Sequence, residues 1–355
     1  METIYEKVNA DDIDGRVMIE AGRIIKAGGL VAFPTETVYG LGGNALDASS
    51  AKKIYEAKGR PSDNPLIVHI ADLSDLYEIA EEVPAAALAL AKEYWPGPLT
   101  MIFRKKPSVP KETTGGLDTV AVRFPSHPVA MEFIRASGGF IAAPSANISG
   151  RPSPTSALHV KEDMDGRIDM IIDSGPCDIG LESTIVDMTE EVPVILRPGF
   201  VSERMLKNVL GDVDKDPAVF GDAPSSQPPK APGMRYRHYA PKGELAIVSG
   251  AREDVISFIR RRTEKKRDGI KCGVIACTDD VPMYPQADLV MDAGSMDNEN
   301  EIASRLYDLL RRCDEENIDE IYSEEFDTPQ MGQAIMNRLI RAAGHNIIKV
   351  QGEER

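Results

Sequence analysis

The sequence predicts an α/β protein with two domains, a larger one followed by a smaller, Rossmann-like one. Short apolar strands and amphipathic helices run along most of its 355 residues, a length that allows two separate cores. A segment rich in Pro, Ser and Asp interrupts them after residue 211, and beyond it strands and helices alternate regularly. We therefore predict a first domain at 1–211, a linker or lid at 212–243 and a second domain at 244–355.

Apolar periodicity and turn residues define the elements of the first domain. The first helix is closed by Gly28-Gly29 and the second is capped by Ser49-Ser50. Buried strands appear as short runs rich in β-branched residues. Helices are predicted at 17–27, 49–58, 84–94 and 129–136, and strands at 30–33, 66–70, 99–104, 119–124, 140–143, 170–173, 183–187 and 193–197.

The second domain shows a strict alternation of strand and helix, which favours a small parallel sheet. Between the two domains, residues 212–232 have neither helical nor strand periodicity, as expected of a linker. Strands are predicted at 245–248, 272–276, 289–291 and 318–322, and helices at 253–265, 299–314 and 331–343.

Composition excludes several classes of protein. The formal net charge of −16 disfavours a protein that wraps nucleic acid, so stable nucleic-acid binding is not expected. No apolar run has the length of a membrane span, and the first residues lack the apolar core of a signal peptide. The four scattered cysteines indicate reduced thiols in a cytoplasmic protein.

The first candidate ligand-binding segment is Pro34–Ala45, which follows a predicted buried strand. Its hydroxyls and glycines could offer backbone N–H groups to an anionic or zwitterionic ligand. Gly-x-Gly-x-x-Ala within it is a weak match to a dinucleotide site, because the next helix starts too late. The alternative is a tight turn that needs glycine.

Four cations end secondary-structure elements beside loops rich in Ser, Thr and Asn. Lys58 and Arg60 follow a helix, and Arg123 and Arg197 end strands. Each alone could be a solvated helix-end charge or a surface ion pair. Together they indicate an anion pocket built for positioning and charge neutralisation. The sequence carries no Walker A, His-Glu-x-x-His, Cys-x-x-Cys or Gly-x-Ser-x-Gly pattern, and no metal ligand is predicted.

At these motifs the sequence resembles the long, two-domain form of the threonylcarbamoyl-AMP synthases, the family with a YrdC-like catalytic domain. That resemblance implies a twisted α/β domain around a large, central basic cavity, followed by a linker and a Rossmann-like domain. It is carried by Gly28–Gly42, Lys58-Gly59-Arg60, Trp95–Thr100, Ser145-Ala146-Asn147, Glu182-Ser183-Thr184, Ala231–Pro241 and Ala334–Arg338.

The resemblance also implies roles for individual residues. Lys58 and Arg60 would be catalytic, Arg123 would pair with the substrate carboxylate, and Mg²⁺ would arrive with ATP. The residues implied to surround L-threonine are Thr37, His69, Arg123, Ala143 and Ser183. Those implied to bind ATP are Lys58, Arg60, Asn64, Thr119, Ser145, Asn147, Ser153, Arg197 and, in the linker, Tyr236.

The implied reaction joins L-threonine, bicarbonate or CO₂, and ATP into L-threonylcarbamoyl-AMP with release of pyrophosphate. A downstream tRNA threonylcarbamoyl transferase complex would then form threonylcarbamoyladenosine (t6A) at position 37 of tRNAs that read codons beginning with A. Two alternatives stay open. One is a maturation enzyme that forms a carbamoyl adenylate from carbamoyl phosphate, which the lack of a cysteine-rich zinc module disfavours. The other is an RNA-binding module, which the acidic charge disfavours.

Overall fold

The computed structural model describes residues 2–217, 231 and 239–351. The chain divides into two compact units, Met1–Ser149 with Ser153–Tyr236, and Gly150–Pro152 with Arg237–Arg355. The predicted linker falls mostly outside the described residues. In the described part, no helix is long and apolar enough to cross a membrane.

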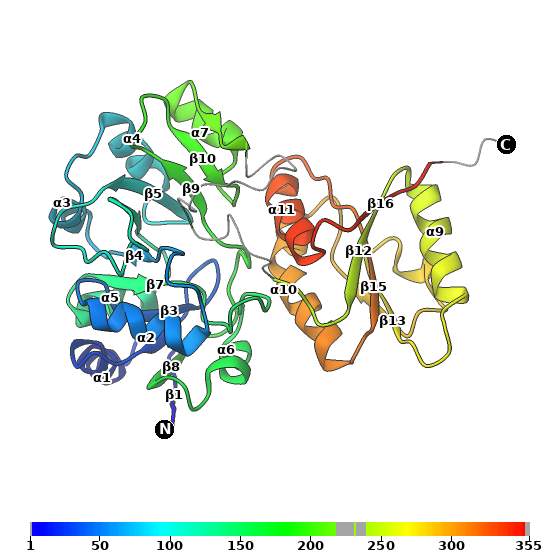
Figure 1. Ribbon diagram of the computed structural model, residues 1–355, viewed down its shortest axis with the longest axis horizontal. Coiled ribbons are helices and arrows are strands. Elements are labelled where there is room, and N and C mark those ends of the chain that lie inside the picture. Colours follow the sequence, from blue (N-terminus) through cyan, green and yellow to red (C-terminus); the bar gives the residue numbers. More distant parts are fainter. Residues whose placement is uncertain (1, 218–230, 232–238, 352–355) are drawn as a thin grey trace. The chain divides into compact units, whose positions relative to one another are not determined.

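The first unit is built on a mixed sheet of 11 strands in the order β1-β8-β2-β3-β7-β4-β6-β5-β9-β10-β11 (Figure 1). Parallel and antiparallel neighbours alternate irregularly, which makes this an α/β domain of mixed type, as predicted. The strands are β1 Ile4–Lys7, β2 Val31–Phe33, β3 Gly40–Asn44, β4 Ile67–His69, β5 Leu99–Arg104, β6 Thr119–Arg123, β7 Ile141–Ala143, β8 Met170–Asp173, β9 Thr184–Asp187, β10 Val194–Arg197 and β11 Asp214–Lys215.

Helices cover this sheet and bury most of its apolar side chains. The first and fifth helices pack against each other, with Gly22 against the backbone of Ala136, and together cover Val31 and Phe33. The helices are α1 Gly15–Lys26, α2 Ala48–Lys58, α3 Leu76–Ile79, α4 Ala85–Tyr94, α5 Pro128–Ser137, α6 Ala157–Met164 and α7 Glu203–Leu210.

Strand register places several predicted site residues on one face of the sheet. Arg123 at the end of β6 lies opposite His69 on β4 and Thr100 on β5. Side chains alternate along a strand, so residues two positions away share that face, whereas the residues between them point into the main core. We call this surface the site face, and define it by Ile67, His69, Thr100, Ile102, Ala121 and Arg123.

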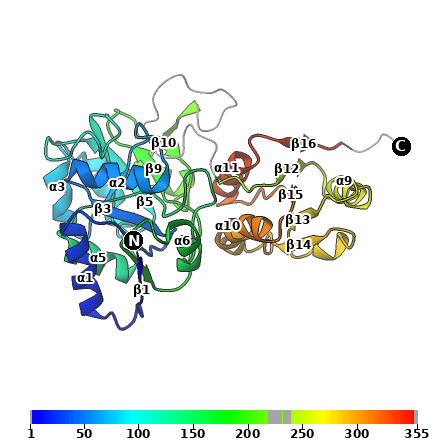
Figure 2. The same cartoon turned by 60° about the horizontal axis from the view of Figure 1, so that its bottom comes forward.

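The second unit is a five-stranded sheet in the order β14-β13-β15-β12-β16, with every pair parallel. Figures 1 and 2 show α9 on one face of this sheet and α10 and α11 on the other, which confirms the Rossmann-like prediction. The elements are β12 Glu244–Ser249, α9 Arg252–Glu264, β13 Cys272–Ala276, β14 Leu289–Asp292, α10 Glu299–Glu315, β15 Glu320–Glu324, α11 Gly332–Ala342 and β16 Ile347–Lys349.

One predicted loop is a strand. Residues 40–44 form β3, which pairs with β2 and β7, so most of their backbone N–H groups face neighbouring strands and not a ligand. The glycines allow close packing, because a Cβ on Gly40 would lie 3.0 Å from the Phe33 ring. The expectation that this glycine-rich stretch binds an anion is therefore wrong for 40–44. Six further elements are not predicted from the sequence: β1, α3, α6, α7, β16 and β11, the last lying within the predicted linker.

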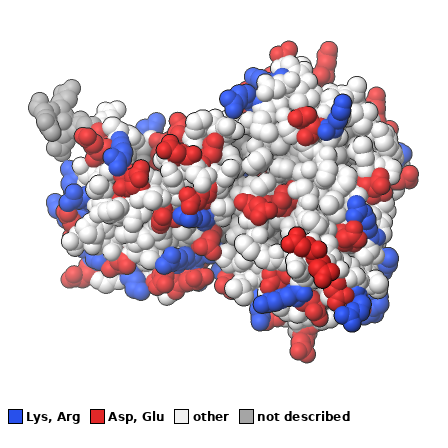
Figure 3. All heavy atoms as spheres, turned by 180° about the vertical axis from the view of Figure 1, so that it is seen from behind, with Lys and Arg blue, Asp and Glu red and all other residues white. Residues whose placement is uncertain are grey.

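Charged side chains of both signs lie on the surface of the protein. Acidic residues outnumber basic ones by 57 to 41. On the face shown in Figure 3, acidic and basic side chains are interspersed.

Candidate active site

Lys58 anchors the Ser-x-Asn loop. It ends α2, whose N-cap is Asp47 and whose last turn is closed by Gly59 in the left-handed conformation. Its side chain is buried, and Nζ donates to the carbonyl oxygen of Ser145 at 2.5 Å and to that of Asn147. The Ser145 hydroxyl donates to Asn147 Oδ1 at 2.6 Å. The cation and the loop thus form one local structure.

Arg60 and Asn64 lie in the turn after α2. The Arg60 guanidinium donates to the carbonyl oxygens of Asn64 and Pro65, the latter at 3.1 Å, which shapes the turn before β4. The Asn64 side chain is buried, and its Oδ1 has no hydrogen-bond partner among the described residues. Buried amide oxygens are normally bonded, so this atom indicates a place for a ligand donor.

Arg123 lies in an ion pair with Glu36, from the loop between β2 and β3. Glu36 Oε1 lies 2.7 Å from Arg123 Nη2, and both side chains are more than nine-tenths buried. The two atoms touch without hydrogen-bond geometry. Glu36 Oε1, Arg123 Nε and Arg123 Nη2 all lack a hydrogen-bond partner within the described ranges. A buried guanidinium with unsatisfied N–H groups is suited to a ligand carboxylate.

His69 is a buried neutral imidazole beside Arg123. Its Nδ1 lies 3.1 Å from the carbonyl oxygen of Ile67, and its ring meets the Phe33 ring edge to face at 5.9 Å. Burial, and then the positive charge of Arg123, lower the pKa of His69 from 6.5 to about 3. The residue therefore offers a hydrogen-bonding group without adding charge.

Ser183 and Arg197 form the next part of the site. Arg197 Nε donates to the Ser183 carbonyl at 3.0 Å, and Nη2 donates to the Ser183 hydroxyl at 3.2 Å. That hydroxyl also lies 2.7 Å from Thr100 Oγ1 on the site face. Gly199 permits this close approach, because a Cβ there would lie 2.4 Å from the backbone nitrogen of Thr184.

The remaining predicted residues lie around these groups. The Thr37 hydroxyl is buried 2.9 Å from that of Thr35, and Ala143 ends β7 two residues before Ser145. Ser153 donates to Glu182 beside Ser183 at 2.6 Å, and Thr119 begins β6 on the same face of the sheet as Arg123 but at the opposite end of the strand. Tyr236 lies outside the described residues.

The structure thus joins the predicted residues into two groups. One group connects Arg123, His69, Ser183, Arg197 and Ser153 through contacts on and beside the site face. The other connects Lys58, Ser145 and Asn147, with Arg60 and Asn64 in the turn that follows Lys58. Strand β7 links them, since it pairs with β4 and leads into the Ser-x-Asn loop.

Apolar side chains fill the centre of the site face. Ile67, Ala121 and Ile102 are cross-strand neighbours in one buried cluster. Ala231 belongs to the same cluster and is fully buried. The chain therefore returns to the site face beyond residue 217, within the segment that the sequence predicts as linker or lid.

Three residues at the site were not singled out from the sequence. Glu36, Thr100 and Glu182 all lie inside motifs that carry the family resemblance. In the sequence, Glu36 is marked only by its position between two threonines. Its partner Arg123 is distant in sequence, so the pair is not apparent there.

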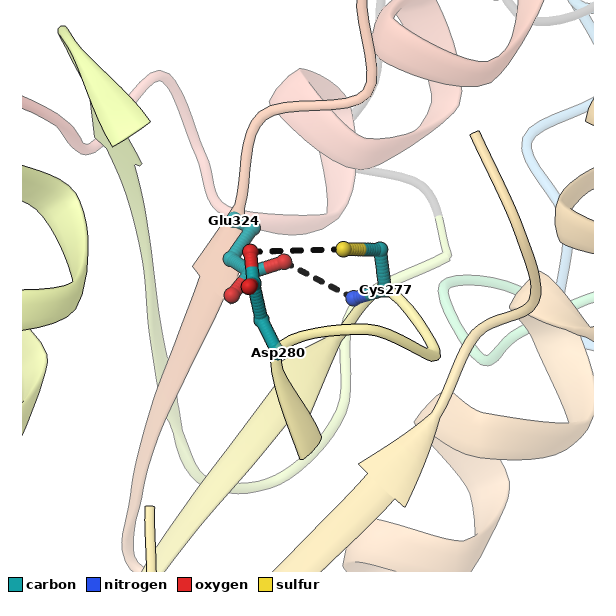
Figure 4. A group of neighbouring side chains, drawn as sticks. All are labelled: Cys277, Asp280 and Glu324. Atoms are coloured by element: carbon teal, nitrogen blue, oxygen red, sulfur yellow. Dashed lines mark hydrogen bonds between the residues drawn. The ribbon is translucent and has the colours of Figure 1, made fainter. Parts of the chain in front are cut away.

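A separate cluster of possible metal ligands lies in the second unit (Figure 4). Cys277 donates from its backbone nitrogen to Glu324 at 2.7 Å and from its thiol to Asp280 at 3.3 Å. Tyr284 donates to Glu324 at 2.6 Å, and Arg252 pairs with Asp280. Burial raises the pKa of Cys277 to about 12 and that of Glu324 above its usual value. These contacts satisfy the cluster internally, and we assign no metal to it.

Comparison with known proteins agrees with both units. The family described as "Telomere recombination" (Sua5, YciO and YrdC) matches residues 23–199, and the family described as "Threonylcarbamoyl-AMP synthase, C-terminal domain" matches 201–344. The threonylcarbamoyl-AMP synthase of Pyrococcus abyssi is 50% identical over 98% of this chain and 100% of its own. That of Bacillus subtilis is 46% identical over 93% of this chain and 94% of its own.

Solved structures extend the agreement to the fold. The crystal structure of P. abyssi Sua5 complexed with L-threonine is 48% identical, covers 98% of this chain and all of that chain, and has a TM-score of 0.92. Escherichia coli YciO covers 56% of this chain and 96% of its own, with 25% identity and a TM-score of 0.51. The chain therefore belongs to the Sua5 family of threonylcarbamoyl-AMP synthases.

Proposed function

We propose that this protein makes L-threonylcarbamoyl-AMP from L-threonine, bicarbonate or CO₂, and ATP, and releases pyrophosphate. The observation that carries the proposal is the buried guanidinium of Arg123, whose Nε and Nη2 have no hydrogen-bond partner among the residues described. Neutral His69 lies beside it, and Arg197 donates a hydrogen bond to the carbonyl oxygen of Ser183 nearby. The family membership and the threonine complex of a relative support the same substrate.

In the proposed reaction, Arg123 binds the threonine carboxylate, and the amine loses a proton and attacks CO₂ to form a carbamate. A carbamate oxygen then attacks the α-phosphorus of ATP, the bond to the β-phosphate oxygen breaks, and pyrophosphate leaves. Two anions must approach each other, and at ~4 Å unit charges repel by about 4 kcal/mol at an effective dielectric of about 20. Lys58, Arg60 and Arg197 would offset this repulsion and the charge that develops at phosphorus.

ATP would enter as its Mg²⁺ complex, so the metal is part of the substrate. The Ser145–Asn147 loop, Asn64, Thr119 and Ser153 would contribute hydrogen bonds to the nucleotide. The linker would close over the reactants and exclude water, because carbamates and mixed anhydrides hydrolyse easily. Buried Ala231 on the site face supports a linker that reaches this far.

The product would pass to a tRNA threonylcarbamoyl transferase complex that completes t6A, and we place this chemistry in the cytoplasm. The experiment that tests the proposal supplies the purified protein with MgATP, L-threonine and ¹⁴C-bicarbonate. We expect label in a threonine-linked adenylate and one pyrophosphate for each product. Release of pyrophosphate with carbamoyl phosphate in place of threonine and bicarbonate would instead favour the maturation enzyme.

A further inference from the structure

Glu36 is the buried acidic partner of Arg123, and the chemistry described above gives it no role. Its Oε2 accepts a hydrogen bond from the backbone nitrogen of Ser126 at 3.3 Å, which fixes one side of the carboxylate. Its Oε1 lies 2.7 Å from Arg123 Nη2 but has no hydrogen-bond partner in the part of the chain that is described.

Burying two charges is costly unless hydrogen bonds satisfy their remaining donors and acceptors. Here Glu36 Oε1 and the Nε and Nη2 groups of Arg123 stay unsatisfied. The nearby hydroxyl of Thr35 is already committed, since it donates to the carbonyl oxygen of Val38 at 2.7 Å. The protein therefore presents an unsatisfied acceptor next to unsatisfied cationic donors.

We propose that Glu36 binds the α-ammonium group of the amino-acid substrate while Arg123 binds its α-carboxylate. An α-amino acid carries these two opposite charges on groups attached to one carbon, so adjacent opposite charges in the protein match it. The pair and the zwitterion are each neutral in sum, and binding adds no net charge to a buried site. This assignment rests on the proposed function.

The pair then selects for an ammonium group, and not only for a carboxylate. An isosteric hydroxy acid keeps the carboxylate that Arg123 binds but offers Glu36 no cation. A hydrogen bond to a charged group contributes enough binding free energy to make the affinity for threonine ~10- to 100-fold higher than that for the hydroxy acid. The matching hydroxy acid for threonine is 2,3-dihydroxybutanoate of the same configuration.

The test measures the affinities of both ligands by calorimetry for the wild-type protein and for Glu36→Gln, which keeps the size of the side chain. We expect threonine to lose ~10- to 100-fold in affinity in the variant, while the weak binding of 2,3-dihydroxybutanoate changes by less than about threefold. Glu6→Gln, on the exposed side of β1, is the matched control and should change neither affinity. ATP affinity and thermal unfolding report whether the variant is folded.

An equal loss for both ligands would overturn the proposal, because Glu36 would then only support Arg123. Equal affinity of the wild type for both ligands would also overturn it. Should Glu36→Gln not fold, the crystal structure of the wild type with threonine decides: the proposal requires the α-nitrogen within hydrogen-bond distance of a Glu36 oxygen. Failure of the wild type to bind threonine or to form the adenylate would instead contradict the proposed function.

Discussion

Lys58 holds the Ser145–Asn147 loop in place, because its buried ammonium group donates hydrogen bonds to the carbonyl oxygens of Ser145 and Asn147. Lys58→Met keeps most of the side-chain volume but removes the charge and the hydrogen bonds to Ser145 and Asn147. We expect kcat/KM for threonine- and bicarbonate-dependent pyrophosphate release to fall by ~100-fold or more, the usual size of a lost electrostatic contact at a reacting oxyanion.

Lys52, exposed on the same helix, provides the matched control, because among the described residues its ammonium group makes a single ion pair, with Glu112 at 3.8 Å. Lys52→Met should retain nearly all activity. A Lys58→Met protein as active as wild type would show that neither the loop nor the phosphates depend on this cation.

His69 should make the stability of the protein depend on pH. Its pKa in the folded protein is about 3, against 6.5 when exposed, so between these values the unfolded chain binds one more proton. Stability from this residue is therefore present above pH 6.5 and falls as the pH is lowered toward 3. Between pH 7 and pH 5 the wild type should lose about 2 kcal/mol more free energy of unfolding than His69→Gln.

Urea unfolding of both proteins at the two pH values measures this difference, and the variant itself serves as the control for all other titrating groups. Equal losses in the two proteins would mean that His69 can be protonated within the fold. A positively charged His69 would then compete with Arg123 for the substrate carboxylate.

Residue type and position point to part of the candidate site. Arg123 and Arg197 ended predicted strands, and both lie within the group that the structure assembles. Glu36 could not be predicted in the same way. Its importance arises from contact with Arg123, and that contact depends on how the loop after β2 crosses the site face.

At the scale of elements, the end of α2 sets the direction of Arg60. Gly59 closes the helix at φ +61°, a conformation that costs an L-residue with a Cβ about 1 kcal/mol or more, although a Cβ there would meet no atom within 4 Å. We expect Gly59→Ala to lower the free energy of unfolding by about 1 kcal/mol. We also expect it to lower activity, because Arg60 follows directly.

Gly15→Ala is the matched control. Gly15 begins α1 and a Cβ there also meets nothing within 4 Å, but its backbone is helical, so alanine should be neutral or stabilising. Chemical denaturation of the two variants gives the comparison. Equal stability of Gly59→Ala and wild type would mean that the left-handed turn is not required.

Elements with strong periodicity were predicted to within about two residues, as for α2 and β5. Strand β3 was not, because its sequence, Gly-Leu-Gly-Gly-Asn, has poor strand propensity and is held by pairing with β2 and β7. Strand β16 is not predicted because it is only three residues long, although its isoleucines favour a strand. Pairing between distant segments is the information that local sequence lacks.

At the scale of the whole molecule, the net charge of −16 argues that this protein handles a small precursor and not tRNA itself. We expect no saturable tRNA binding in a filter assay at physiological salt, and no change in the rate of adenylate formation when tRNA is added. Tight binding that weakens steeply with salt would indicate a basic RNA-binding surface and favour the RNA-binding alternative.

The most direct test of the account is a crystal structure of the wild-type protein with L-threonine and a non-hydrolysable ATP analogue. We predict the threonine carboxylate on the Nε and Nη2 groups of Arg123, and the nucleotide phosphates between Lys58, Arg60 and Arg197. The threonine nitrogen should lie within hydrogen-bond distance of a Glu36 oxygen. A complex in which threonine lies away from Arg123, or in which the phosphates avoid these three cations, would contradict the account.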